Sequence, residues 1–220
     1  MNAPVKPLNI AIVLYEGVTA MDFAGPLDVL AHWPGARIHV VAESPSIRTD
    51  TGVEVCATST FADELRPEIL VVPGSGTRML AALEDAALIG WVREASSTAR
   101  WTTSVCSGST ILAAAGVLSG RRASTHWAFA DVLERFGVAY SDERYVIDSP
   151  VATAAGVSAG VDMALALTAH ELGPELAQAI QLGLEYDPQP PFDAGSPAKA
   201  PEPIVARTRE VLRAMAGAAV

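Results

Sequence analysis

Residues 101–109 read Trp-Thr-Thr-Ser-Val-Cys-Ser-Gly-Ser, an apolar run that ends at a cysteine and continues in small residues. The first five predict a buried strand, and residues 107–115 predict the start of a helix. A sharp turn from strand into helix needs small residues two positions either side of its central residue, and Ser104 and Gly108 stand there. The stretch therefore predicts a strand–turn–helix unit with Cys106 at the turn.

Other runs of Val, Ile and Leu predict strands of the same kind, at residues 9–14, 37–42 and 69–72. Their apolar residues are continuous instead of alternating, which is typical of parallel strands that are covered on both faces. Helices are expected from the apolar spacing at residues 85–95, 127–136, 158–172 (with Ser158 as the N-cap) and 174–184. The alternation predicts an α/β fold, a doubly wound and mostly parallel sheet with helices on both faces.

The remaining stretches complete one expected domain that covers residues 1–220. Residues 49–60 and 140–155 predict short strands that form a hairpin or a sheet edge. A proline-rich segment at 187–203 is expected to run extended over the domain, and a last helix is expected at 204–216.

The composition excludes several classes of function. The formal net charge is −10, and an acidic surface repels phosphate backbones, so we expect no nucleic-acid partner. No uninterrupted apolar stretch has the length of a membrane span, and the opening residues MNAPVKPLN lack the apolar core of a signal peptide. We therefore expect a cytoplasmic protein with no membrane partner.

The cysteines and histidines bear on metal and disulfide chemistry. The two cysteines, Cys56 and Cys106, lie fifty positions apart and form no disulfide framework, which is consistent with a reducing compartment. The four histidines are scattered without ligand spacing, so no metal site is expected. Cys56, within the strand-like VEVCA, is expected in the core.

Cys106 has two readings that the spacing alone leaves open. Free cysteine is among the most buried residue types, so a core thiol is one of them. The other is a nucleophile, because the start of the following helix would place backbone N–H groups and a positive dipole end beside the sulfur and favour the thiolate.

Asp22, in Thr-Ala-Met-Asp-Phe-Ala-Gly-Pro at 19–26, also has two readings. It is a suitable N-cap for a helix that begins near Pro26. Alternatively, it is a carboxyl group that lies against the cysteine, where burial and like charge would raise its pKa and let it act as a general acid.

Four motifs in this order resemble the ThiJ/PfpI superfamily, which is class I glutamine amidotransferase-like: MDFAGP at 21–26, VVPGSG at 71–76, SVCSGS at 104–109 and RRASTHW at 121–127. The stretch QLGLEYDPQPPFDAGSP at 181–197 is similar to the isocyanide hydratase branch of that superfamily. The resemblance implies a flavodoxin-like sandwich with a cysteine nucleophile elbow, a homodimer, and no cofactor or metal.

The resemblance also implies the roles of individual residues. Cys106 would be the nucleophile and Asp22 the acid–base residue, while Ser107 stands where the branch usually has threonine. Backbone groups around Gly74, Ser75 and Gly108 would stabilise developing negative charge. Of the remaining motif residues, His126 and Trp127 are expected as pocket-wall or structural residues, and Gly156 as a close backbone packing position.

The reaction that the resemblance implies is hydration of a small-molecule isocyanide to an N-substituted formamide through a cysteine thioimidate. Two alternatives remain. A glyoxalase-like or deglycase-like enzyme of the superfamily often has histidine directly after the cysteine, where this chain has Ser107. A non-enzymatic redox sensor would need an exposed thiol of low pKa. The related regulators carry a helix-turn-helix segment, for which the sequence after residue 216 is expected to leave no room.

Overall fold

The computed structural model describes residues 6–63 and 65–217. Its centre is a seven-stranded sheet in the order β10-β11-β7-β6-β1-β2-β5, in which only β10 is antiparallel to its neighbour. The strands are β1 (Leu8–Val13), β2 (Ala36–Ala42), β5 (Ser59–Thr60), β6 (Ile69–Val72), β7 (Trp101–Val105), β10 (Tyr145–Asp148) and β11 (Val151–Ala154). The prediction of a mostly parallel, doubly wound sheet is confirmed.

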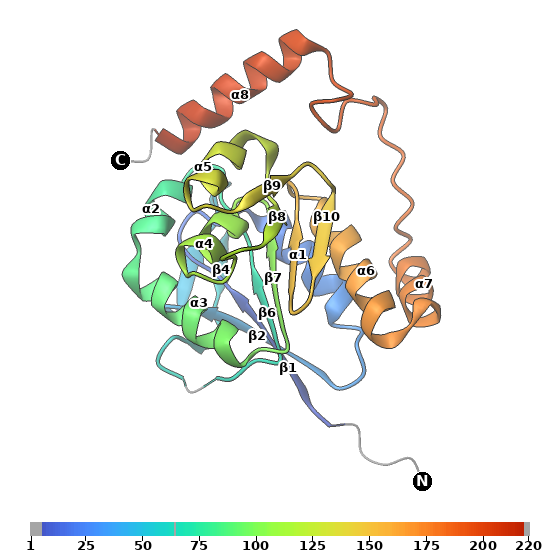
Figure 1. Ribbon diagram of the computed structural model, residues 1–220. Coiled ribbons are helices and arrows are strands. Elements are labelled where there is room, and N and C mark those ends of the chain that lie inside the picture. Colours follow the sequence, from blue (N-terminus) through green and yellow to red (C-terminus); the bar gives the residue numbers. More distant parts are fainter. Residues whose placement is uncertain (1–5, 64, 218–220) are drawn as a thin grey trace.

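Helices cover both faces of this sheet (Figure 1). One face carries α1 (Ala20–Leu30), α6 (Ala159–Leu172) and α7 (Pro174–Gly183). The other carries α2 (Met79–Glu84), α3 (Ala86–Thr98), α4 (Gly108–Ala114) and α5 (Ala130–Arg135), which follows the 3-10 turn η1 (Trp127–Phe129). In Figure 1, α3 and α4 lie to the left of the strands and α6 and α7 to the right.

The core lies on the central strands because their side chains are apolar on both faces. Ile10 and Ile12 of β1 and Ile69 of β6 are fully buried, and Trp101 at the start of β7 is nearly so. Burial of one such side chain stabilises the fold by about 1.5–3 kcal/mol. The continuous apolar runs in the sequence therefore fix these strands in the middle of the sheet.

The expected start of α1 is wrong, whereas Ser158 is confirmed at the N-cap position of α6 but makes a different hydrogen bond. α1 begins at Ala20, six residues before Pro26, which lies inside the helix. Ser158 does occupy the N-cap position of α6, but its hydroxyl forms no capping hydrogen bond and instead accepts one from Arg144 at 3.0 Å. At Ser158 a tertiary interaction, and not the local capping preference, therefore determines where the side chain points.

Cys56 is exposed, so its expected place in the core is wrong. It ends β4 (Glu54–Cys56), which pairs with β3 (Ser46–Arg48) in a two-stranded antiparallel ribbon outside the main sheet. Val55 packs against the core, and because side chains alternate along a strand its neighbour Cys56 faces solvent. A second small pair, β8 (Arg122–Ser124) and β9 (Ala139–Ser141), lies near α5.

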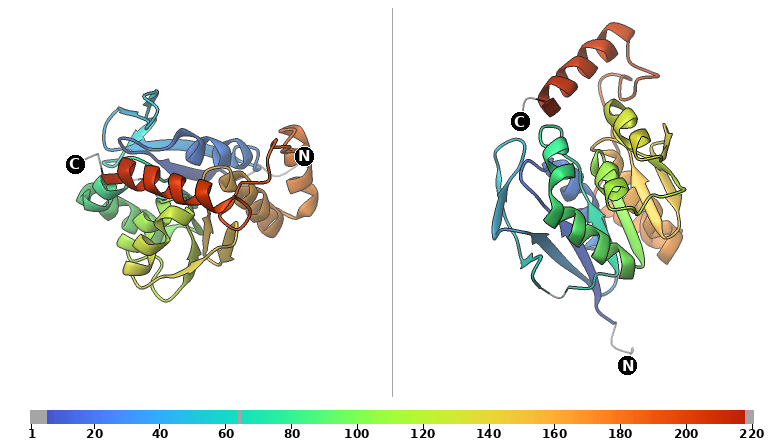
Figure 2. Two further views of the ribbon diagram at one scale, coloured as in Figure 1. Left: turned by 90° about the horizontal axis from the view of Figure 1, so that it is seen from above. Right: turned by 60° about the vertical axis from the view of Figure 1, so that its left-hand side comes forward.

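The last helix, α8 (Glu202–Gly217), follows residues 184–201, which form no regular helix or strand. It crosses above the sheet and contacts α2 and η1 (Figures 1 and 2). Ala216 there forms a small apolar cluster with Met79 and Phe129. Among the described residues, no helix is both long enough and apolar enough to cross a membrane.

Candidate active site

Cys106 follows β7 directly and has a backbone φ of 58°. A non-glycine residue in this left-handed region is strained, at a cost of roughly 1–3 kcal/mol. The strain is held by hydrogen bonds: the Cys106 N–H donates to the carbonyls of Ala154 and Ala155 at 3.2 and 2.9 Å, and its carbonyl accepts from the Thr125 hydroxyl at 2.9 Å. The cysteine is thus fixed at the tight turn that the sequence predicts.

Two glycines allow this turn to approach the end of β6. A Cβ on Gly108 would lie 2.1 Å from the carbonyl oxygen of Val72, and a Cβ on Gly74 would lie 2.6 Å from both the N and the Oγ of Ser107. Real Cβ atoms do not come so close to backbone atoms. Both positions therefore require glycine for a steric reason, independent of any contact with a substrate.

Asp22 lies in the first turn of α1 and is completely buried. Its Oδ2 accepts a hydrogen bond from the Gly74 N–H at 3.1 Å. Its Oδ1 is buried without a hydrogen-bond partner among the described residues. Because α1 begins two residues earlier, Asp22 does not act as its N-cap, and the carboxyl group lies beside the Cys106 thiol, so that each group affects the pKa of the other.

Burial raises the pKa of Asp22 from 3.8 to about 7. The hydrogen bonds to Gly74 and Cys106 oppose this rise, and the negative charge of Asp50 adds to it. The Asp22 carboxyl therefore exchanges its proton near neutral pH, as an acid–base group must.

Burial also raises the pKa of the Cys106 thiol well above 9.0, and the charge of Asp22 raises it further. The backbone N–H groups of Ser107 and Val157 act in the opposite direction. The expectation of a resting thiolate is therefore wrong: α4 is short, and a helix end contributes only about 0.3–1 kcal/mol, less than burial of a charge costs.

The peptide groups expected to stabilise negative charge are partly occupied. The N–H of Ser75 donates to the Ser107 hydroxyl at 2.9 Å, and that hydroxyl donates back to the Ser75 carbonyl at 2.9 Å. The Gly74 N–H is taken by Asp22. The N–H groups that lower the pKa of the sulfur belong to Ser107, which directly precedes the expected Gly108, and to Val157, which was not expected, while the Ser107 hydroxyl joins two loops.

Two residues beside the Cys106–Asp22 pair, Val157 and Tyr15, were not among the predicted site residues. Val157 has a φ of 43°, which is rare for a β-branched residue and gives no signal in a sequence, because valine there suggests a strand. Tyr15 is buried after β1 and donates its hydroxyl to the Pro73 carbonyl at 3.0 Å. Burial raises the pKa of Tyr15, as do the negative charges of Asp22, Cys106 and Asp50. Both residues follow shortly after the end of a strand, and this is the only feature of the sequence that could have pointed to them.

The remaining motif residues, His126, Trp127 and Gly156, make contacts within the fold. His126 accepts a hydrogen bond from the Ala128 N–H at 3.3 Å, and burial lowers its pKa to about 4, so it is neutral at physiological pH. A Cβ on Gly156 would lie 2.4 Å from the His126 ring. Trp127 turns toward the C-terminal segment, where the Arg209 guanidinium lies 4.7 Å from its ring centre.

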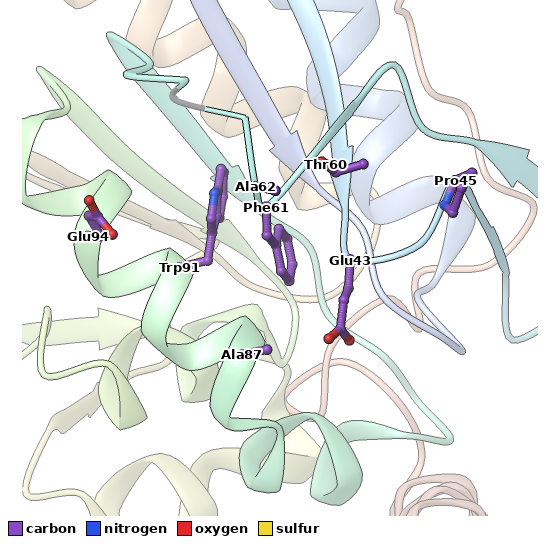
Figure 3. A pocket seen from close by; sticks show the side chains of 8 residues that line it. All are labelled: Glu43, Pro45, Thr60, Phe61, Ala62, Ala87, Trp91 and Glu94. Carbon is purple, nitrogen blue, oxygen red and sulfur yellow. The ribbon is translucent and has the colours of Figure 1, made fainter.

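The groove in Figure 3 lies apart from these residues, between the β2–β5 edge and α3. Its volume is about 650 Å³, and Phe61 and Trp91 stack in it with ring centres 5.2 Å apart. It contains none of the residues that the sequence predicts for the site. Within the described part of the chain, no group of three or more His, Cys, Asp or Glu side chains is arranged to hold a metal ion.

Comparison with known proteins gives a consistent picture. The DJ-1/PfpI family matches residues 8–170. An isonitrile hydratase from Pseudomonas putida is 40% identical over 204 residues, which are 92% of this chain and 89% of that protein. The transcriptional regulator CdhR from Pseudomonas aeruginosa is 30% identical over 75% of this chain and 51% of its own. The crystal structure of a ThiJ/PfpI family protein from Pseudomonas syringae superimposes with a TM-score of 0.92 at 37% identity and covers 96% of this chain and 88% of its own.

Proposed function

We propose, from the premise that this chain belongs to the DJ-1/PfpI family, that it hydrates isocyanides to N-substituted formamides at Cys106. The observation that carries the proposal is the buried Cys106–Asp22 pair, in which the acid titrates near neutral pH beside a strained cysteine. The similarity to an isonitrile hydratase, isonitrile being another word for isocyanide, supports the choice of substrate.

The first step forms a covalent bond to sulfur. The terminal carbon of an isocyanide, R–N≡C, accepts a soft nucleophile and then needs a proton. As the Asp22 carboxylate takes the proton of the Cys106 thiol, the sulfur attacks this carbon, and Asp22 then transfers the same proton to it. One S–H bond breaks and one S–C and one C–H bond form, which gives the thioimidate R–N=CH–S–Cys106.

The second step releases the product. Asp22, again a carboxylate, takes a proton from a water molecule while the oxygen attacks the thioimidate carbon, and it transfers that proton to the nitrogen to give R–NH–CH(OH)–S–Cys106. The C–S bond of this tetrahedral adduct then breaks, the hydroxyl proton passes through Asp22 to the Cys106 sulfur, and the formamide R–NH–CHO leaves. In both steps the N–H groups of Ser107 and Val157 lower the energy of the sulfur when it carries negative charge.

Two features of the site disfavour the alternatives. A redox sensor needs an accessible, acidic thiol, whereas Cys106 is 4% exposed and burial raises its pKa. A glyoxalase-like reaction would need a second proton carrier beside the cysteine. The Ser107 hydroxyl is bound to Ser75, and His126 Nδ1 is bound to the Ala128 N–H.

The proposal includes a homodimer. Five large apolar side chains are exposed in the last forty residues, a density of exposed apolar groups that marks many interaction surfaces. These side chains are Leu182, Phe192, Ile204, Val211 and Met215, with exposed fractions from 41% to 81%. A second copy of the chain that covers this C-terminal region would remove the apolar surface from water.

The deciding experiment supplies an aryl isocyanide to the purified protein and follows the formation of the N-aryl formamide by chromatography. We expect turnover by the wild type and by Cys56→Ser, whose thiol is exposed and distant from the site. Cys106→Ala should show no turnover above the rate without protein. Equal activity of Cys106→Ala and wild type would refute the covalent mechanism, and absence of turnover in the wild type would refute the assigned reaction.

A further inference from the structure

A second carboxylate lies close to Asp22 on another part of the chain. Asp50, in the turn after β3, is half-buried, and its Oδ2 accepts a hydrogen bond of 2.6 Å from the hydroxyl of Thr19. Thr19 is the N-cap residue of α1, and its carbonyl accepts the N–H of Asp22 at 3.1 Å. Thr19 thus binds the carboxylate of Asp50 through its hydroxyl and the backbone of Asp22 through its carbonyl.

The hydrogen bond from Thr19 to Asp50 takes the place of the capping hydrogen bond that a threonine usually makes at the start of a helix. A threonine at an N-cap usually accepts a hydrogen bond from the first turn of its own helix, which contributes about 0.5–2 kcal/mol. Here Thr19 makes no such bond and donates to Asp50 instead. The backbone reinforces the arrangement, because the Asp50 N–H donates to the Val18 carbonyl at 3.1 Å.

Asp50 is also incompletely satisfied. Its Oδ1 is buried and has no hydrogen-bond partner among the described residues, as is also true of Oδ1 of Asp22. A carboxylate placed in this way lacks a cation or a second donor to offset its charge. Its field therefore acts on the nearby groups, and it adds to the rise in the pKa of both Asp22 and Tyr15.

We propose that Asp50 is a positioning residue for the site: it is held by Thr19 at the start of α1, and its negative charge adds to the effect of burial in favouring the protonated Asp22 carboxyl group. This rests on the proposed function, in which the Cys106–Asp22 pair must lose one proton before Asp22 can accept the proton of the thiol. Asp50 would then raise the pH at which the pair becomes active, without touching the substrate.

The other charged groups around Asp22 leave this role to Asp50. Tyr15 and Cys106 face it, but both remain protonated at neutral pH because burial raises the pKa of each. The strands β1, β6 and β7 carry no Asp, Glu, Lys, Arg or His. On α6, Asp162 is paired with Arg144.

The remaining groups lie at the edges of this region. His170 and Glu171 stand at the far end of α6. The aliphatic stem of Arg78 lies against Gly17, and Arg78 is exposed to solvent. Arg48 and Glu16 are exposed as well, so water screens the charge of each.

The test measures the protonation of Asp22 directly, by NMR of the full-length protein labelled with 13C at the aspartate carboxyl carbons. Comparison with Asp22→Asn identifies the Asp22 signal. We expect a midpoint of about 7 in the wild type and a midpoint lower by roughly half a pH unit in Asp50→Asn, because removal of a nearby negative charge makes the proton easier to lose. An unchanged midpoint in Asp50→Asn would overturn the proposal.

Two controls separate the charge of Asp50 from its place in the fold. Asp28→Asn removes one negative charge from the exposed side of α1 and should leave the midpoint unchanged. Thr19→Val removes the hydroxyl that holds Asp50 and should lower the midpoint, whereas Thr19→Ser should retain the wild-type value. If Asp50→Asn fails to fold, the Thr19 pair decides the matter, and equal midpoints for Thr19→Val and Thr19→Ser count against the proposal.

The NMR titration tests the role of Asp50, and the turnover assay tests the proposed function, so one can give a negative result while the other gives a positive one. A midpoint that moves in a protein without isocyanide turnover would refute the proposed function and support the role of Asp50. Turnover of isocyanide together with an unchanged midpoint in Asp50→Asn would support the proposed function and refute the role of Asp50. Where both hold, the acidic limb of kcat/KM for isocyanide should move to lower pH in Asp50→Asn by the same amount as the NMR midpoint.

Discussion

At the scale of single residues, the site depends on one proton shared by two buried groups. Asp22 releases its proton at a pH of about 7, and the Cys106 thiol does so well above 9.0. Between these values the pair holds a single proton, which can lie on either group, so its titration belongs to the pair. This is the state in which Asp22 can accept the thiol proton.

We therefore expect kcat/KM for an isocyanide to rise with pH through about 7 and to stay high until the remaining proton is lost. The rise occurs because the second proton on the pair blocks Asp22 as a base. Initial rates in a series of buffers, corrected for the acid hydrolysis of isocyanide without protein, give the profile. A rate that falls between pH 6 and 8 would contradict the assignment.

Asp22 should also reduce the stability of the fold where it is ionised. Its folded pKa of about 7 exceeds the unfolded value of 3.8, so between these values the folded state keeps a proton that the unfolded state has lost. Its stabilising effect is complete below pH 3.8 and is lost as the pH rises to 7, a change of about 4 kcal/mol.

Asp22→Asn removes this dependence. We expect the variant to lose about 10²–10⁴-fold in activity. At pH 8 it should nevertheless unfold with a free energy about 2–4 kcal/mol above that of the wild type, with the gap closing toward pH 4. Urea denaturation of both proteins at several pH values measures the gap, and a gap that widens toward low pH would have the wrong sign.

At the scale of elements, the site is assembled where α1, α6 and β7 pack together. A Cβ on Gly160 of α6 would lie 3.0 Å from Val105 Cγ2 and 3.1 Å from Pro26 Cγ. Val105 directly precedes Cys106, and Pro26 lies one helical turn after Asp22. The small residue in α6 thus determines how closely the helix that carries the acid and the strand that carries the cysteine approach each other.

A pair of glycine substitutions tests this packing. In a helix interior, alanine is more favourable than glycine by about 0.8–1.0 kcal/mol. Gly90→Ala in α3, where a new Cβ would meet no atom within 4 Å, should gain about this amount. Gly160→Ala should gain nothing or lose stability, and should lower isocyanide turnover, because its Cβ pushes α6 away from β7 and α1.

Thermal or denaturant unfolding of both variants, compared with the wild type, gives the answer. Equal stabilisation by the two substitutions would show that α6 and its neighbours move apart at little energetic cost, and it would contradict this prediction.

At the scale of the whole molecule, the chain after α7 is unusual in its exposed apolar side chains. The strands of the sheet bury their large apolar side chains, and the helices on it expose single ones such as Met21 and Leu80. The segment after α7 and the helix α8 leave Phe192, Ile204 and Val211 exposed within twenty residues. α8 also lies across the end of the sheet where the loops of the site collect (Figure 1). Both features are consistent with assembly of two copies through this region.

We expect the protein to sediment as a dimer and Val211→Asp to raise the dissociation constant of that dimer by at least tenfold, because a carboxylate would be buried against an apolar surface. Glu210→Gln, on the adjacent and charged position of α8, is the matched control and should leave the dimer intact. Sedimentation velocity over a concentration series distinguishes them. A monomeric wild type would remove this part of the proposal.

The amino-acid sequence alone determined the class of fold and the central cysteine. Continuous apolar runs predict parallel strands because a strand buried on both faces needs them, and small residues around Cys106 predict its turn because larger ones collide with β6. Composition and local pattern carry this information, since each of these requirements acts within a few residues of the chain.

Only the tertiary structure decided the chemistry of the site. The true start of α1, the exposure of Cys56, the neutral thiol and the N–H group of Val157 depend on groups distant in sequence. The connection from Asp50 through Thr19 to Asp22 joins two parts of the chain in the same way. A pKa responds to the burial and charge that surround a group in space, and these exist only once the chain has folded.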